Sequence, residues 1–307
     1  ARTSASASTS PILRSHVAMP FRVDGYDYQV TGDSGNNLQY EVKESGNKST
    51  GQLTWAFGAG KVGQSYLSQE GESYREIRFS YFSNLNEFDV TPNQFLQTVP
   101  TIQKAAGRLL SEGEARRCFG CHTTASTVGN TFDPGKAMPG VSCEGCHGPG
   151  AKHVSEMKAG NLEGGLAAIT NPSQLKPVDA VDFCGACHTT WWDAKEIGAN
   201  GIANVRFQPY RLESSRCWSR GDARLACFAC HDPHQPLVKD AGYYDSKCLS
   251  CHANRLAKTQ AQKLAGCPVA TKDCVTCHMK KYEVKNMHFK YTDHRIGITK
   301  ADAGFPE

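Results

Sequence analysis

Residues 118–122 read CFGCH, and the same Cys-x-x-Cys-His spacing returns five more times before residue 279. Amino-acid frequencies alone predict roughly 0.02 such motifs in a chain of this length, so chance does not explain the repetition. The six motifs use 12 of the 14 cysteines in the 307 residues. They comprise Cys118, Cys121 and His122; Cys143, Cys146 and His147; Cys184, Cys187 and His188; Cys227, Cys230 and His231; Cys248, Cys251 and His252; and Cys274, Cys277 and His278.

The spacing suits covalent attachment of haem c. Positions i, i+3 and i+4 share one face of a helical turn, so both thiols can bond the two vinyl groups of one porphyrin. The adjacent imidazole then reaches the iron as its proximal ligand. Zinc sites do not require that histidine, and disulfide frameworks do not require the two-residue gap. The sequence therefore predicts six covalently bound haem c groups.

Helical signals accompany two of the motifs. Ser111 and Glu114 form a capping-box pattern just ahead of Cys118, which predicts that a helix begins there. A second helix is predicted over residues 244–264, ending at Gly266.

Five histidines lie outside the motifs and are candidates for the distal ligand of a haem iron: His16, His153, His234, His288 and His294. Residues 148–150, Gly-Pro-Gly, predict a turn that directs His153 away from its own haem and toward a neighbour. Six irons with two histidines each need more than the 11 histidines in the chain. Unless an α-amine or a histidine from another protein fills in, at least one iron therefore takes a methionine, another side chain, water or an open position.

Upstream of the motifs, the sequence has the period of β-strands. Apolar residues alternate in four segments near residues 26–30, 38–42, 53–57 and 77–81, which predicts a β-meander. The first 19 residues are rich in serine and alanine and are expected to be a flexible arm. We therefore predict an arm over residues 1–19, a β-rich module over 20–100 and a haem region over 101–307.

The haem region has little chain per haem. The six motifs span the 161 residues from 118 to 278, or about 27 residues per haem. We expect a mostly irregular and α-helical region whose core is formed largely by the haems themselves. Four aromatic residues are expected to pack on the porphyrins: Trp191, Trp192, Trp218 and Phe228.

Charge and hydropathy exclude other classes of protein. The 34 basic and 30 acidic residues leave a formal charge of +4 with no basic run, which argues against nucleic-acid binding. No stretch approaches the roughly 18 apolar residues of a membrane span. Covalent haem is attached outside the cytoplasm, and the chain opens at Ala1. We therefore expect an exported protein, periplasmic or extracellular, whose signal peptide has been removed.

Two cysteines lie outside the motifs. Exported proteins usually pair such thiols, so a disulfide between Cys217 and Cys267 is predicted. Two free thiols, or one thiolate bound to an iron, are the alternatives.

The sequence around the motifs resembles that of multihaem c-type cytochromes. The segments that carry the resemblance are CEGCHGPGAKH at 143–153, CFACHDPH at 227–234 and CVTCHMKK at 274–281, followed by MHFKYTDH at 287–294. Over residues 110–295 the chain resembles the group of the tetrahaem nitrifier cytochrome, and its haem count is similar to that of hexahaem cytochromes that form extracellular filaments. The resemblance implies stacked haems that move single electrons. The chain lacks the Cys-x-x-Cys-Lys site of larger enzymatic relatives.

We expect an electron carrier or conduit rather than an enzyme, and assign no catalytic residue. Its partners are then redox proteins or extracellular acceptors. A homopolymer is a second form of the same function, in which the N-terminal arm delivers His16 to an iron of the next copy. The alternative function is a reductase of a small nitrogen or sulfur species at one open haem iron.

Overall fold

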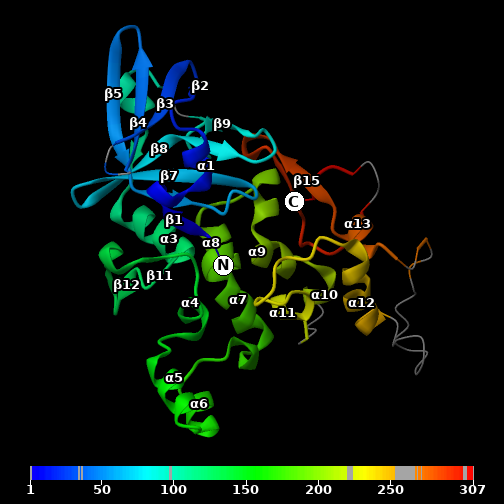
Figure 1. The fold of residues 1–307 in the computed structure, drawn as a ribbon. Helices are drawn as coiled ribbons and strands as arrows, with labels where there is room; N and C mark the ends of the chain where they lie inside the picture. The colour runs from blue at the N-terminus through cyan, green and yellow to red at the C-terminus, as the bar shows by residue number, and fades with distance from the viewer. Residues whose placement is uncertain are drawn as a thin grey trace, which may run out of the picture. The chain divides into compact units, whose positions relative to one another are not determined.

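The computed structural model describes residues 2–33, 35, 37–96, 99–219, 224–252, 267, 269–270, 272–299 and 303–306. The chain forms two compact units (Figure 1). The first comprises Ala1–Thr170 with Lys285–Phe289, and the second comprises Asn171–Val284 with Lys290–Glu307. The chain first passes from one unit to the other after residue 170, and the predicted boundary at residue 100 lies within the first unit. None of the helices described is both long and apolar enough to span a bilayer.

One of the two larger sheets of the first unit has four antiparallel strands, in the order β2-β3-β4-β5. Its strands are β2 (Pro20–Val23), β3 (Tyr26–Gly32), β4 (Leu38–Glu44) and β5 (Asn47–Leu53). Alternation sets the buried face, because Tyr26, Tyr28 and Val30 are buried while Asp27 between them is exposed. A two-residue turn joins β2 to β3, and its Gly25 has a φ of +87°, which suits glycine.

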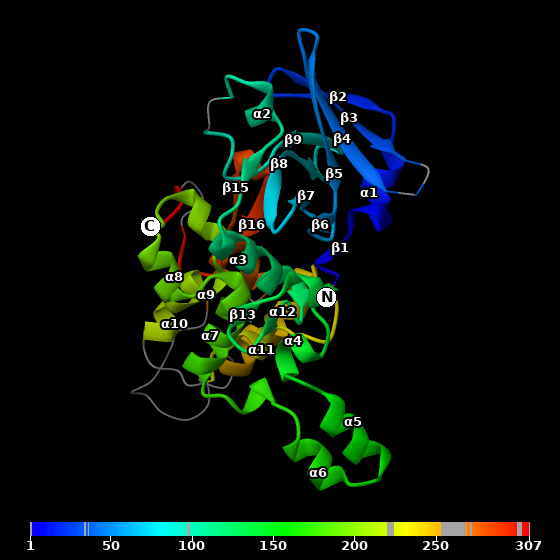
Figure 2. The same ribbon diagram turned by 90° about the vertical axis from the view of Figure 1, so that its left-hand side faces the viewer.

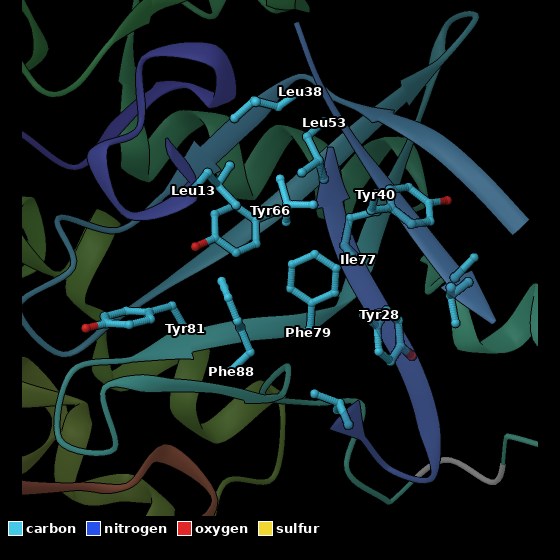
Figure 3. Packing of buried hydrophobic residues seen from close by; sticks show 14 of the residues in the cluster. Leu13, Tyr28, Leu38, Tyr40, Leu53, Tyr66, Ile77, Phe79, Tyr81 and Phe88 are labelled. Atoms are coloured by element: carbon cyan, nitrogen blue, oxygen red, sulfur yellow. The ribbon is translucent and has the colours of Figure 1, made fainter. Parts of the chain in front are cut away.

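The second sheet of this unit has the order β1-β6-β7-β8-β10, with β9 paired to β8. Its strands are β1 (Ser4–Ser6), β6 (Trp55–Phe57), β7 (Gly63–Glu70), β8 (Ser73–Phe82), β9 (Glu87–Val90) and β10 (Arg108–Leu109). Tyr28 and Tyr40 of the first sheet share one buried core with Tyr66 and Phe79 of the second (Figure 3). The β-rich region exists, with more strands than the four predicted segments.

The N-terminal residues are not a flexible arm, contrary to the expectation from composition. β1 pairs with β6 as an edge strand of the second sheet. A 3-10 turn, η1 (Ala7–Thr9), and a helix, α1 (Pro11–Ser15), follow. The Ser10 hydroxyl accepts a hydrogen bond from the Leu13 amide, which caps α1, and Leu13 is fully buried. Backbone pairing and the buried side chains of Ala7, Ser10 and Leu13 hold a segment whose composition is otherwise typical of a loop.

The remainder of the first unit carries the first two motifs. Its helices are α2 (Ile102–Ala105), α3 (Glu112–His122), α4 (Glu144–His147), α5 (Ala151–Lys158) and α6 (Leu162–Ala167), with the 3-10 turns η2 (Pro134–Lys136) and η7 (Lys285–Met287). Short strands pair as β11 (Thr123–Thr124) with β14 (Met138–Pro139), and β12 (Thr127–Val128) with β13 (Thr131–Phe132). The capping box of Ser111 and Glu114 is confirmed at the start of α3. Helices α5 and α6 lie side by side (Figure 2).

The second unit is built mainly from short helices. These are η3 (Pro172–Gln174), α7 (Pro177–His188), α8 (Trp191–Glu196), η4 (Ile202–Arg206), α9 (Gln208–Glu213), α10 (Arg216–Ser219), α11 (Cys227–Cys230), α12 (Ala241–His252) and α13 (Cys274–His278), with strands β15 (Lys281–Val284) and β16 (Phe289–Thr292). Helix α12 begins at Ala241, before the predicted start at residue 244, and its predicted end at 264 lies outside the described residues. Both clusters of buried apolar side chains found among the described residues belong to the first unit.

Candidate haem sites

Five of the six Cys-x-x-Cys-His motifs carry their histidine on a helical turn. We number the motifs as sites 1 to 6 in chain order. Sites 1, 3 and 5 end the helices α3, α7 and α12, whose last residues are His122, His188 and His252. Sites 2 and 6 make up nearly all of the short helices α4 and α13. This is the local geometry that the spacing i, i+3, i+4 predicts. Site 4 differs, because α11 ends at Cys230 and His231 has an extended backbone.

Site 1 is built into the β-rich region. Phe119, which lies between the two cysteines, is fully buried, and its ring centre lies 5.1 Å from Trp55 and 5.2 Å from Phe57. Phe57 also stacks on the His122 imidazole at 5.2 Å. Cys118 packs against the same cluster, and burial raises the pKa of its thiol to about 11. The sheet therefore supports the attachment helix directly.

Sites 1 and 2 are connected through β11, which contacts both α3 and α4. The Thr124 hydroxyl donates to the Gly140 carbonyl at 2.9 Å and accepts from the Ser142 amide at 2.9 Å. These bonds fix the residues that lead into the second motif against the end of the first.

Backbone carbonyls orient the imidazoles of three motif histidines. Nδ1 donates over 2.8 Å from His122 to Thr3, over 2.7 Å from His147 to Thr170, and over 2.9 Å from His278 to Gly297. A ring N–H held by a carbonyl fixes the tautomer with the proton on Nδ1, which is the form that binds a metal through Nε2. Sequence reasoning missed these three partners, because a carbonyl oxygen belongs to every residue and carries no sequence signal.

Three of the predicted distal histidines have the same arrangement. Nδ1 donates over 2.7 Å from His16 to Ile12, over 2.8 Å from His153 to Gly165, and over 3.1 Å from His294 to Thr292. The turn predicted before His153 is present, with a φ of +75° at Gly148. In each of the three, Nε2 is the nitrogen left for a metal.

His288 and His234 differ from the other distal candidates. His288 Nε2 donates to the Asp89 carboxylate over 2.8 Å, so the nitrogen usually given to iron already has a partner. The His288 carbonyl in turn accepts from the Asn84 side chain at 2.8 Å. The side chain of His234 is 74% exposed and lies 3.6 Å from Asp232. Iron ligation by these two histidines stays a prediction. His288 would have to release Asp89, and His234 would have to bind a haem at the surface.

Sites 3 to 6 follow one another through contacts between their helices: α7 contacts α11, α11 contacts α12, and α12 contacts α13. The Cys184 thiol of site 3 interacts with the Cys227 thiol of site 4, which lowers the pKa of Cys184 to about 7. Asp245 of α12 accepts hydrogen bonds from the amides of Asp273 at 2.6 Å and Cys274 at 2.8 Å. This carboxylate therefore fastens the start of α13 to α12.

Three imidazoles gather in the second unit. Burial lowers the pKa values of His188 and His231, and lowers the pKa of His294 to about 4. All three are therefore neutral at physiological pH, which is the form that binds iron.

Apolar side chains beside the motifs of the second unit face outward from the polypeptide. Phe228 of site 4 is 41% exposed and Leu249 of site 5 is 40% exposed, whereas Phe119 of site 1 is fully buried. Trp192 is 69% exposed and meets Trp191 edge-on at 4.9 Å. Exposed apolar surface of this kind marks a place where another apolar body binds. The thiols, the oriented imidazoles and this apolar surface together fit covalent haem.

The structure records no disulfide between Cys217 and Cys267, both of which it describes. Burial raises the pKa of the Cys230 thiol, and the neighbouring Cys217 adds to that effect. The predicted bridge therefore stays a prediction.

Comparison with known proteins agrees with this chemistry. A family model described as cytochrome c554 and c-prime matches residues 90–148. The multihaem cytochrome MtrA of Shewanella baltica is 26% identical over 216 residues, covering 66% of this chain and 54% of the relative. The dissimilatory sulfite reductase MccA of Wolinella succinogenes is 24% identical over 162 residues, covering 48% of this chain and 20% of that relative.

Among solved structures, the outer cell wall cytochrome OcwA is similar with a TM-score of 0.44 and 15% identity, over 80% of this chain and 68% of that one. The chain spans about half the length of MtrA and a fifth of MccA. The repeated motif, the matched family model and the similarity to MtrA support the same type of protein, a multihaem c-type cytochrome.

Proposed function

We propose that the chain is an electron conduit that moves single electrons along six covalently bound haems. The observation that carries this proposal is the series of helix contacts that links sites 3, 4, 5 and 6 in chain order. Because each porphyrin is bonded to its two cysteines, neighbouring attachment helices bring neighbouring haems together. When bound, haem supplies an iron that gains and loses one electron, with a potential set by its axial ligands and surroundings.

The chain's own residues have distinct tasks in this proposal. The cysteine pairs fix each haem in place, and the motif histidines supply the proximal nitrogen. Carbonyls such as those of Thr3, Thr170 and Gly297 hold the imidazoles in the tautomer that binds iron. Exposed apolar side chains such as Phe228 and Leu249 cover the porphyrins and exclude water. The haems then form much of the core of the second unit.

Deleting single attachment sites tests the conduit. The double variant C248S/C251S lacks haem 5, in the middle of the contact series, and C274S/C277S lacks haem 6, at its end. Each keeps five haems, so total redox capacity is matched. After flash reduction, electrons should spread among the remaining haems much more slowly in C248S/C251S than in C274S/C277S. Equal rates in the two variants would contradict a linear relay through site 5.

A reductase is the second candidate function. The 11 histidines cannot complete six bis-histidine irons, and the structure gives His288 Nε2 to Asp89. These observations favour at least one iron with an exchangeable position, and one relative is named as a sulfite reductase. Electron paramagnetic resonance (EPR) of the oxidised protein tests this candidate. A high-spin ferric signal that shifts with nitrite, hydroxylamine or sulfite supports the reductase. If no such signal appears, the reductase is excluded and electron transfer remains the proposed function.

We further propose that the protein is exported and acts in the periplasm or at the cell exterior, with redox proteins or extracellular acceptors as partners. Covalent haem attachment outside the cytoplasm supports export. A filament is one form of this conduit. Because β1 pairs with β6 of the same chain, a polymer would use His16 directly after α1 rather than a free arm. Electron microscopy of wild type and H16A tests that form, since only wild type should then show filaments.

A further inference from the structure

The imidazoles of His231 and His294 lie close together in the second unit. Their ring centres lie 6.2 Å apart, with the ring planes 41° from parallel. Among the described residues, His231 is the one histidine whose ring contacts His294. His231 ends the motif of site 4, whereas His294 lies beyond all six motifs.

Hydrogen bonds show which nitrogen of each ring carries the proton. The Tyr244 hydroxyl donates to the Val238 carbonyl at 2.8 Å, so the same oxygen accepts from His231 Nδ1 at 3.4 Å. His294 Nδ1 donates to the Thr292 carbonyl at 3.1 Å. Both protons therefore reside on Nδ1, and both Nε2 atoms keep a lone pair.

The separation of the rings equals the span of two imidazoles on one metal ion. An imidazole nitrogen binds a transition metal at about 2.0–2.1 Å and lies about 1.1 Å from its own ring centre, so two imidazoles on opposite sides of one ion have ring centres about 6.2–6.4 Å apart. The observed 6.2 Å agrees with this value. An angle of 41° is neither the stacked nor the edge-to-face geometry that packed rings prefer.

A buried clamp fixes the segment that carries His294. The Arg211 guanidinium of α9 binds the Asp293 carboxylate through two hydrogen bonds, of 2.8 and 2.7 Å. The two side chains are 1% and 3% exposed. The Ser215 hydroxyl donates to the His294 carbonyl at 3.0 Å and accepts from the Ile296 amide at 2.8 Å.

Two residues near the C-terminus also contact Arg211. Arg211 also donates to the Pro306 carbonyl at 2.7 Å, and its guanidinium lies over the Phe305 ring at 4.4 Å from the ring centre. A buried charge pair with two parallel hydrogen bonds holds a fixed direction as well as a distance. The backbone on both sides of His294 therefore has little freedom.

We propose that His294 is the second axial ligand of the haem attached at Cys227 and Cys230, opposite His231. Arg211, Asp293 and Ser215 are positioning residues that hold the His294 imidazole at its distance from His231. This rests on the proposed function only in that a haem is bonded at site 4. It assigns a ligand from the end of the chain to the fourth haem rather than to the sixth, which is nearer in sequence.

The test compares His294→Ala with wild type by EPR and by haem content. The haem count should stay unchanged, while one haem per chain turns from low-spin to high-spin and returns to low-spin when imidazole is added. In a C227S/C230S background, which lacks haem 4, the same substitution should open no further haem. A high-spin haem that appears even in that background would assign His294 to another iron and overturn the pairing.

A second variant tests the assignment if the C227S/C230S protein, which lacks haem 4, does not fold well enough to be purified. His294→Met should give one haem with the thioether-to-iron charge-transfer band and a raised potential, at an unchanged haem count. Absence of that band, together with an unaltered low-spin spectrum in H294A, would show that His294 is not a ligand. If the wild-type protein carries no covalent haem, the proposed function itself is refuted. The intact mass of the wild-type protein shows this before any variant is made.

The positioning residues are tested by Asp293→Asn and Ser215→Ala. Each should shift the low-spin EPR signal of one haem, the same haem that H294A opens, and leave the other signals in place. A purely structural role would lower the melting temperature without moving that one signal. Unchanged spectra in both variants would remove the clamp from the proposal.

Discussion

Replacing Phe119 with alanine tests how the β-rich region supports site 1. The side chain is fully buried between the two cysteines of the motif. Four aromatic rings surround it, with centre-to-centre distances of 5.1 Å to Trp55, 5.2 Å to Phe57, 5.0 Å to Tyr74 and 5.5 Å to Phe132. These neighbours lie on three separate strands, β6, β8 and β13, so they cannot close the gap together.

The expected loss follows from burial and cavity formation. Removing a buried phenylalanine side chain forfeits about 1.5–3 kcal/mol of transfer free energy. The cavity that remains raises the total to about 3–5 kcal/mol when the surroundings do not collapse. We therefore expect F119A to lower the free energy of unfolding of the first unit by about 3–5 kcal/mol.

The chain offers a matched control in Phe228, which occupies the same position of its motif in site 4 but is 41% exposed. Urea unfolding of the haem-loaded protein, followed by circular dichroism of the sheet, should show F228A within about 1 kcal/mol of wild type, because Phe228 belongs to the second unit and is not part of the cluster of buried side chains around Phe119. Haem content, measured in parallel, shows whether either variant loses its haem. Equal destabilisation by the two substitutions, or a loss below 1 kcal/mol in F119A, would refute the role assigned to the β-rich region.

Three further predictions concern other sites. Asp245→Asn should loosen α13, because the amides of Asp273 and Cys274 lose a charged acceptor. The rate of amide hydrogen exchange in residues 274–278 should rise, while the rate in α3 stays constant. His153→Ala should turn one haem high-spin if His153 is a distal ligand, and an unchanged EPR spectrum would exclude it. A disulfide between Cys217 and Cys267 would close a loop of 51 residues and stabilise the chain by roughly 4 kcal/mol. Non-reducing peptide mapping should find the linked pair, and two separately alkylated thiols would rule it out.

Local signals predicted the attachment helices and the β-rich region. Ser111 and Glu114 satisfy each other's backbone groups within four residues, so their capping box needed no tertiary information. The alternation of Tyr26, Tyr28 and Val30 likewise identified β3, because one face of that strand is buried. Each of these features is determined by residues close together in the chain.

The remainder depends on contacts between distant residues. β1 is an edge strand of small polar residues, held by its pairing with β6, and no periodicity marks it. The carbonyl of Thr3 holds the His122 imidazole across 119 positions of chain. The pairing of Arg211 with Asp293 depends in the same way on how α9 meets the C-terminal segment. Composition and motif spacing cannot predict such partners, because only the folded chain brings them together.

The number of haems per chain tests the account most directly. Intact mass and a pyridine-haemochrome assay of the purified protein together count the haems that are covalently bound. The account predicts six, one for each Cys-x-x-Cys-His motif. A count of four or fewer would contradict it, because at least two of the six motifs would then carry no haem.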